Sequence, residues 1–103
     1  MTIRTTLAAT LFLAIFCGHA NAASEDTCRA CHAIDNKVVG PPFREVAARY
    51  KDDRQAIEKL KKSMLEGSSG KWGDVAMPPN AGLTPQEAER FAHWVMSLNV
   101  AAP

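Results

Sequence analysis

The chain has 103 residues, of which 47% are hydrophobic and 22% charged, and its 12 basic and 11 acidic residues give a formal net charge of +1. This length allows one small domain, and the composition excludes both a disordered chain and a strongly basic nucleic-acid-binding surface. The first 22 residues predict a secretory signal peptide: Arg4 precedes an apolar run from Leu7 to Cys17, and Ala20-Asn21-Ala22 forms a cleavage site. The run has 11 residues, too few to span a bilayer, which takes about 20.

Cleavage after Ala22 leaves a mature domain of residues 23–103, which is 81 residues long. Removal of Arg4 and Cys17 leaves 11 basic and 11 acidic residues, and only Cys28 and Cys31 as cysteines. We expect this chain to be exported from the cytoplasm without a membrane anchor. Such a short chain builds only a small core, and two cysteines three positions apart cannot link distant elements. Something else must therefore fill the middle of the fold.

The mature chain predicts an all-helical domain with long loops. Five segments are expected before the last helix: a helix capped by Ser24 and running to about Ala33, a loop over 35–42, a helix over 43–50, a helix capped by Asp52 or Asp53 and closed by Gly67, and an irregular segment over 68–83. The last helix has the strongest signals, with Thr84 as N-cap, Pro85 at the first position and Glu87 completing a capping box.

The chemistry lies in Cys28-Arg29-Ala30-Cys31-His32. The Cys-x-x-Cys-His pattern is the signature of c-type haem attachment. Cysteines at i and i+3 of a helix share one face, about 5–6 Å apart, so both sulfurs can reach the two vinyl groups of one porphyrin. His32 follows directly and is expected to ligate the iron.

Three alternatives for these residues are less favoured. A zinc site needs four ligands, and beyond this motif the mature chain offers only His93. A thioredoxin-like redox pair requires a βαβ setting, which the sequence lacks. A structural disulfide between Cys28 and Cys31 would leave the domain with almost no reinforcement of its core.

The second axial position of the iron has four candidate ligands: Met64, Met77, His93 and Met96. Met64 and Met96 lie in or beside helical stripes, where a methionine more often fills the core. His93 is expected to be exposed on the last helix. Met77 lies in a loop and precedes Pro78-Pro79, which stiffen the segment. We therefore favour Met77, since a His/Met pair raises the reduction potential of a haem iron.

Taken together, five segments resemble the class I c-type cytochromes: Cys28 to Asp35, Lys37 to Pro41, Gly70 to Gly73, Met77 to Asn80 and His93 to Val95. More narrowly, the chain is similar to the small bacterial cytochromes of the c-551/c-552 group over residues 27–98. The resemblance implies a small class I cytochrome c fold of four or five helices wrapped around one covalently bound haem c. It also implies electron transfer in the bacterial periplasm.

The resemblance further implies roles around the haem. The Pro41 carbonyl accepts a hydrogen bond from the His32 ring, and histidines that ligate haem normally have such a partner. Trp72 lies near a haem propionate, and Asn80 bonds to the sulfur of Met77. Plainer interpretations stay open: Pro41 as a turn residue, Trp72 as packing, and Asn80 as the end of a loop.

Two features depart from the family pattern. A longer helix usually precedes the first haem cysteine, whereas only residues 23–27 precede Cys28 here. Ser63 stands where the spacing from Trp72 often places a basic residue near a propionate, and Lys59 or Lys62 is the expected substitute.

We predict a monomeric electron carrier that catalyses no reaction of its own and binds neither nucleic acid nor membrane. Its expected partners are redox proteins: a donor such as a membrane cytochrome complex, and an acceptor such as a terminal oxidase or nitrite reductase. Two alternatives stay open. A haem enzyme or gas sensor would need an iron position that opens easily, and a subunit dedicated to one enzyme would have nearly the same sequence features.

Overall fold

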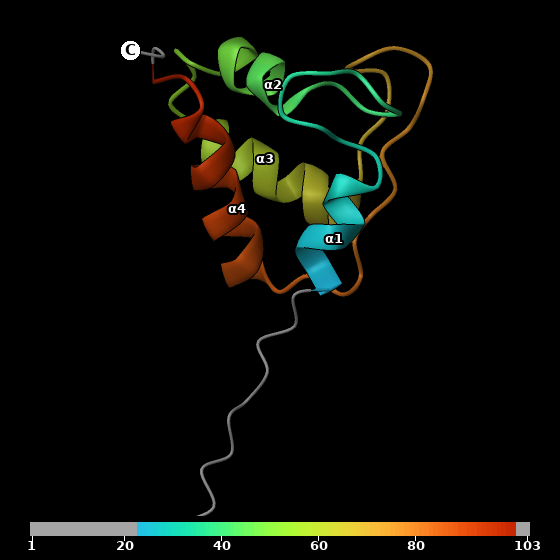
Figure 1. Cartoon of the computed structure of the whole chain (residues 1–103). Helices are drawn as coiled ribbons and strands as arrows, with labels where there is room; N and C mark the ends of the chain where they lie inside the picture. Colours follow the sequence, from blue (N-terminus) through green and yellow to red (C-terminus); the bar gives the residue numbers. More distant parts are fainter. Residues whose placement is uncertain (1–22, 101–103) are drawn as a thin grey trace, which may run out of the picture.

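The computed structural model describes residues 23–100, so the predicted signal peptide over 1–22 lies outside the described residues. The regular elements of this range are four helices: α1 (Ala23–Arg29), α2 (Phe43–Arg49), α3 (Ala56–Glu66) and α4 (Pro85–Ser97) (Figure 1). Ser68 and Met77 form an isolated β-bridge. The predicted all-α fold is confirmed. None of the described helices is long and apolar enough to cross a membrane.

The first helix differs from the prediction at both ends. It begins at Ala23, which places Ser24 inside the helix instead of at its N-cap, and it ends at Arg29 instead of near Ala33. One further turn follows, in which Cys31 N–H (3.2 Å) and His32 N–H (2.9 Å) donate to the carbonyl of Cys28. The carbonyl of Cys31 then accepts from Val39 N–H (3.2 Å) and Gly40 N–H (2.7 Å) in the returning loop.

The second helix confirms the prediction over 43–50, although no side chain caps its N-terminus. The preceding segment satisfies its first free N–H groups instead. Phe43 donates to the carbonyl of Ala33 (2.9 Å) and Arg44 donates to that of Ile34 (3.1 Å). The segment that follows the haem-attachment motif is thereby fixed to the start of α2.

The third helix begins at Ala56, later than a cap at Asp52 or Asp53 predicts. The Asp53 carboxylate accepts from the backbone N–H of Gln55 (2.8 Å), in the turn before the helix, and from Lys59 Nζ (2.5 Å). These bonds, with the one from Lys59 the stronger, hold the pKa of Asp53 below its usual value. Asp53 therefore organises the turn that leads into α3 and not the first turn of the helix itself.

Gly67 closes α3, as predicted, with φ of 79°. This left-handed conformation favours glycine, and space is also short there. A Cβ at Gly67 would lie 2.7 Å from the carbonyl oxygen of Met77 and 3.0 Å from the nitrogen of Pro79. The absence of a side chain lets the loop that carries Met77 lie directly against the end of α3.

The last helix confirms the predicted capping box. Thr84 Oγ1 accepts from Glu87 N–H (3.2 Å), and Thr84 N–H donates to Glu87 Oε2 (2.8 Å). The backbone N–H and then the hydroxyl of Thr84 lower the pKa of the Glu87 carboxyl. Ala88, Ala92 and Val95, which share one face of α4, are buried.

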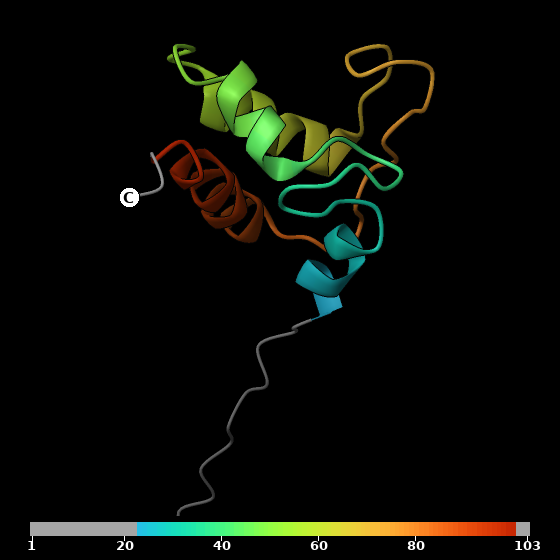
Figure 2. The same cartoon turned by 45° about the horizontal axis from the view of Figure 1, so that its top comes forward.

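The core lies where α4 packs against α3 and α2. It consists of Phe43, Val46, Ala47, Leu60, Met64, Leu83, Ala88, Ala92 and Val95. Phe43 is its aromatic centre, with Phe91 and Trp94 edge-on at centroid distances of 5.4 Å each. Figures 1 and 2 show both long connections, 35–42 and 68–83, on the same side of these three helices.

Candidate haem site

A cavity of about 690 Å³ lies between the two long connections and the helices. Its volume falls in the range of roughly 300–1,000 Å³ that is usual for small-molecule and cofactor sites. Cys28, Cys31, His32 and Met77 all line it, together with side chains from α2 and α3. The structure thus brings together all four residues predicted for haem attachment and iron ligation.

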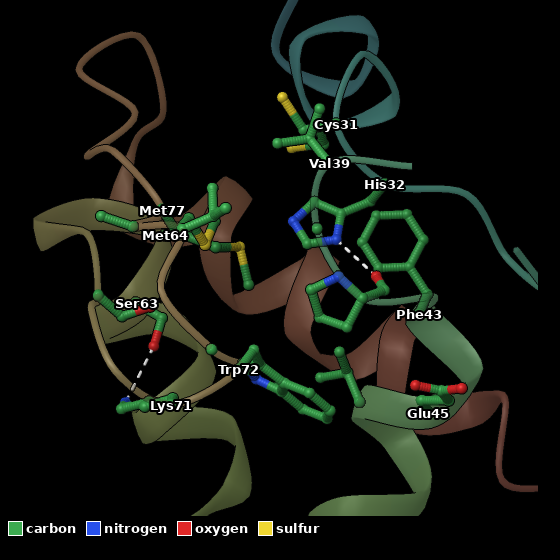
Figure 3. Close-up of a pocket in the computed structure, with 18 of the residues that line it drawn as sticks. Cys31, His32, Val39, Phe43, Glu45, Ser63, Met64, Lys71, Trp72 and Met77 are labelled. Carbon is green, nitrogen blue, oxygen red and sulfur yellow. Dashed lines mark hydrogen bonds between the residues drawn. The ribbon is translucent and has the colours of Figure 1, made fainter. Parts of the chain in front are cut away.

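His32 is held in one orientation by three neighbours. Its Nδ1 lies 2.8 Å from the carbonyl oxygen of Pro41 (Figure 3). A neutral imidazole has one N–H donor and one acceptor nitrogen, so a bond to a carbonyl assigns the proton to Nδ1 and leaves the lone pair on Nε2. The ring stacks on Phe43 at 4.9 Å. A Cβ on Gly40 would lie 2.4 Å from His32 Cε1, so only glycine fits there.

Met77 is held on the wall of the cavity across from His32 (Figure 3). Its backbone pairs with that of Ser68 in both directions, at 2.9 and 2.8 Å. Three residues later, Asn80 N–H donates to the carbonyl of Met64 near the end of α3 (2.9 Å). The loop is therefore tied at Met77 to the segment just after α3, and three residues later to α3 itself.

Position separates the other candidate ligands. His93 and Met96 lie on α4 and are not among the residues that line the cavity, and His93 is exposed. Met64 lines the cavity, is buried in the core and lies beside Met77 (Figure 3). Two thioethers therefore face the site. The one on α3 belongs to the packed core, and the one on the loop does not.

Trp72 and Asn80 occupy different surroundings. Trp72 lines the cavity, and the guanidinium of Arg49 lies 4.4 Å from its ring centroid. Asn80 lies outside the cavity lining, and its side-chain oxygen accepts from Gly82 N–H at 3.3 Å, the pattern of an Asx turn. The bond from Asn80 to the sulfur of Met77 stays a prediction.

The expected substitutes for a basic residue at Ser63 have other partners. Lys59 pairs with Asp53 at 2.5 Å and Lys62 pairs with Glu66 at 3.8 Å, and neither lysine lines the large cavity. The lysine beside Ser63 is Lys71, whose Nζ lies 3.3 Å from Ser63 Oγ.

The sequence did not single out several of the lining residues, among them Lys71, Tyr50 and Val75. Tyr50 lines the cavity from the C-cap of α2, and Val75 lines it from the long loop with 65% of its surface exposed. The spacing of Tyr50 from Phe43 marks it as facing inward but does not indicate a cavity. The irregular segment around Val75 has no periodicity from which a facing can be derived.

The residues that line the cavity fit a haem. Two cysteines of the attachment motif lie at one end, as Cys31 does in Figure 3, and an imidazole and a thioether lie on opposite walls. The remaining lining is largely apolar, with Val46, Leu60 and Phe91 among its members. No cluster of three or more potential metal-binding His, Cys, Asp or Glu side chains occurs in residues 23–100.

Comparisons with known proteins agree with this chemistry. The family model described as cytochrome c matches residues 20–99. The chain is 44% identical to cytochrome c-551 of Pseudomonas denitrificans over 71 residues, which is 69% of this chain and 85% of that protein. It resembles the crystal structure of wild-type Nitrosomonas europaea cytochrome c552 with a TM-score of 0.71 and 39% identity, covering 75% of this chain and 95% of that one.

Such relatives are small electron-transfer proteins and not enzymes, and their haem c is attached through the same Cys-x-x-Cys-His pattern. Cys28, Cys31 and His32 supply that pattern here. With the match of sequence, fold and attachment motif, the chain belongs to the cytochrome c family and carries covalently attached haem c.

Proposed function

We propose that this protein is a periplasmic one-electron carrier in which His32 and Met77 ligate the haem iron. The observation that carries the proposal is the pair of opposed, anchored side chains. His32 has its Nδ1 committed to Pro41, and Met77 is fixed to Ser68 by two backbone bonds on the facing wall. Both ligands are held in place by the protein, so little rearrangement is needed when the iron changes its oxidation state.

Each residue of the site has one task in this proposal. When bound, haem supplies the ferric/ferrous couple. Cys28 and Cys31 tether it at one end of the cavity, and His32 offers Nε2 as a strong ligand. Met77 offers a thioether, which favours ferrous iron and raises the potential. With both axial positions filled, neither substrate nor gas reaches the iron easily, which separates a carrier from a haem enzyme or sensor.

Export is part of the proposal. Residues 1–22 have the three parts of a signal peptide, and haem of this type is attached outside the cytoplasm. The mature carrier, residues 23–103, would take electrons from a donor such as a membrane cytochrome complex. It would pass them to an acceptor such as a terminal oxidase or nitrite reductase.

One spectroscopic experiment tests this function. The alkaline pyridine assay of the purified, matured protein should show one haem c with two thioethers, and the oxidised protein should show the far-red absorption band of sulfur-to-iron ligation. The band should vanish on reduction. A high-spin ferric spectrum without the far-red band would contradict His/Met ligation and favour an enzyme or sensor.

The surface around the cavity suggests where redox partners dock. Val38, Val39 and Val75 line the cavity yet expose 54%, 52% and 65% of their surfaces. The mature chain has equal numbers of acidic and basic residues, so its net charge, with two ionised propionates, is close to zero. Weak long-range steering and an apolar contact suit a small, transient interface that releases its partner after electron transfer.

Val38→Glu should slow electron transfer to a terminal oxidase or nitrite reductase more than Lys37→Ala does. A carboxylate at position 38 would be buried when the partner binds and would oppose an apolar contact, whereas Lys37 contributes only a peripheral charge. The second-order rate, measured by stopped flow across a physiological range of salt, should fall only modestly as salt rises. Val100→Glu introduces the same charge at another exposed valine, outside the cavity lining, and should leave the rate nearly unchanged. A steep fall with salt, or a normal rate in Val38→Glu, would place docking elsewhere.

A further inference from the structure

The end of the cavity opposite the thioether cysteines is polar. Figure 3 shows Cys31 at one end and Ser63, Lys71 and Trp72 at the other. Among the described residues, Ser63 is the one polar residue that is buried, with 8% of its surface exposed. It lies on the inward face of α3 beside Met64. A hydroxyl on that face is out of place in an apolar core, but it suits a cavity whose occupant has a polar end.

Haem has such a polarity. Its two vinyl groups and its two propionates lie on different edges of the porphyrin, so cysteines that hold the vinyl edge leave the carboxylates for the far end. This inference therefore rests on the proposed haem site. The far end needs a cation, because an ionised carboxylate in a partly buried position requires a charged or hydrogen-bonding partner.

The lining of the cavity contains two basic side chains, Lys37 and Lys71. Lys37 belongs to the loop of Val39, which lies beside Cys31 at the thioether end (Figure 3). Lys71 lies at the far end, where its Nζ contacts the neutral hydroxyl of Ser63 at 3.3 Å. In the described part of the chain no carboxylate lies within 4.0 Å of this ammonium group, whereas Lys59, Lys61 and Lys62 all pair with acids.

The backbone of Lys71 is fixed by α2. Arg49 Nη1 donates to the Lys71 carbonyl (2.5 Å), and the same guanidinium lies over the Trp72 ring. Gly70 and Gly73 on either side have φ of 74° and 107°, which allows the chain to turn sharply around these two residues. Arg49 is not among the residues that line the haem cavity, so it acts as a clamp on the loop and not as the cation of the site.

We infer that Lys71, held by Ser63 and by the Arg49 clamp, is the cation that binds a haem propionate in this protein. The lysine belongs to the loop that faces α3, and its ammonium group contacts the Ser63 hydroxyl. A basic side chain at position 63 itself is therefore not needed to bring a cation to this end of the cavity. Other charged or titratable groups around this end are Arg49, Tyr50, Asp53, Lys59 and Lys62. Two acids, Glu45 of α2 and Asp74 of the loop, also line the haem cavity.

The test is the reduction potential of the matured protein as a function of pH, at low and high salt. Lys71→Gln should raise the pKa of the propionate step by about one unit or more, since a contacting opposite charge lowers a carboxyl pKa by about that amount. It should also lower the potential, because loss of a nearby cation favours ferric iron. Both effects should persist in high salt, which screens exposed charges but not contacting ones.

Lys62→Gln is the matched control, since it removes the same charge one residue from Ser63 on an exposed side chain. It should leave the pH step in place, and any shift in potential should disappear in high salt. Lys71→Arg should restore the step, and Ser63→Ala should move it in the direction of Lys71→Gln by a smaller amount. If Lys71→Gln yields little holoprotein, the Ser63→Ala shift decides.

Equal responses of Lys71→Gln and Lys62→Gln would overturn the inference, as would a step that moves only in Arg49→Gln. A failure of the proposed function looks different. It would appear in the unmodified protein as a missing haem c or a missing far-red band, before any lysine is replaced.

Discussion

His32→Ala should yield almost no folded holoprotein. A domain of this size has a total stability of about 4–12 kcal/mol, and the described core surrounds a cavity of about 690 Å³ that haem must fill. Without the imidazole the iron loses its strong ligand, Phe43 loses its stacked partner and the Pro41 carbonyl loses its donor. The yield of folded holoprotein should fall at least tenfold. Haem content per chain and far-UV circular dichroism measure this outcome.

His93→Ala is the matched control. This imidazole lies on α4, is exposed and is not part of the cavity lining, so its removal should leave haem content and helicity unchanged. Cys28→Ala or Cys31→Ala should give an intermediate result, with at most one thioether in the product. Recovery of a helical, haem-free His32→Ala protein would show that the chain folds without its cofactor.

Much of the site is local in sequence, which is why it could be predicted. The attachment motif places two sulfurs and an imidazole within five consecutive positions, and the Thr84 capping box has its partners three positions apart. Met77 could be singled out because prolines follow it directly. These signals depend only on spacing along the chain, so they can be recognised without knowing how the helices pack.

Other features depend on where distant segments meet, and no local pattern encodes that. Arg49 reaches Trp72 across 23 positions, and Lys71 reaches Ser63 across a loop whose path is set by glycines with positive φ. The two lysines expected near Ser63 pair with acids in the structure, Lys59 with Asp53 and Lys62 with Glu66. Spacing along α3 does not show which neighbouring lysine points toward the site, since a neighbour on the same helix can point away from it.

The end of α1 shows the same limit at short range. The predicted helix continued to about Ala33 because nothing in the local sequence stops it. It ends at Arg29, and after one further turn the carbonyl of Cys31 accepts bonds from Val39 and Gly40 of the returning loop, a contact that no local pattern predicts.

Under the proposed ligation by His32 and Met77, Met77→Ala should open the iron to carbon monoxide, cyanide or water. The sixth ligand is lost, while His32 and both thioethers still hold the haem. The reduction potential should also fall, since a thioether favours ferrous iron and its loss favours the ferric form. Loss of the far-red band, carbon monoxide binding after flash photolysis and a redox titration measure the three effects.

Met64→Ala separates the two thioethers that face the cavity. Met64 is buried on α3 with 6% of its surface exposed, so its truncation should cost about 2–5 kcal/mol of stability yet retain the far-red band. Met77→Ala should show the opposite pattern, with the band lost and a smaller direct loss of packing, because Met77 is only half-buried. If the far-red band disappears in Met64→Ala and survives in Met77→Ala, the ligand is Met64 on α3. If the unmodified protein already binds carbon monoxide rapidly at neutral pH, its iron is open and the electron-carrier proposal gives way to a sensor or enzyme.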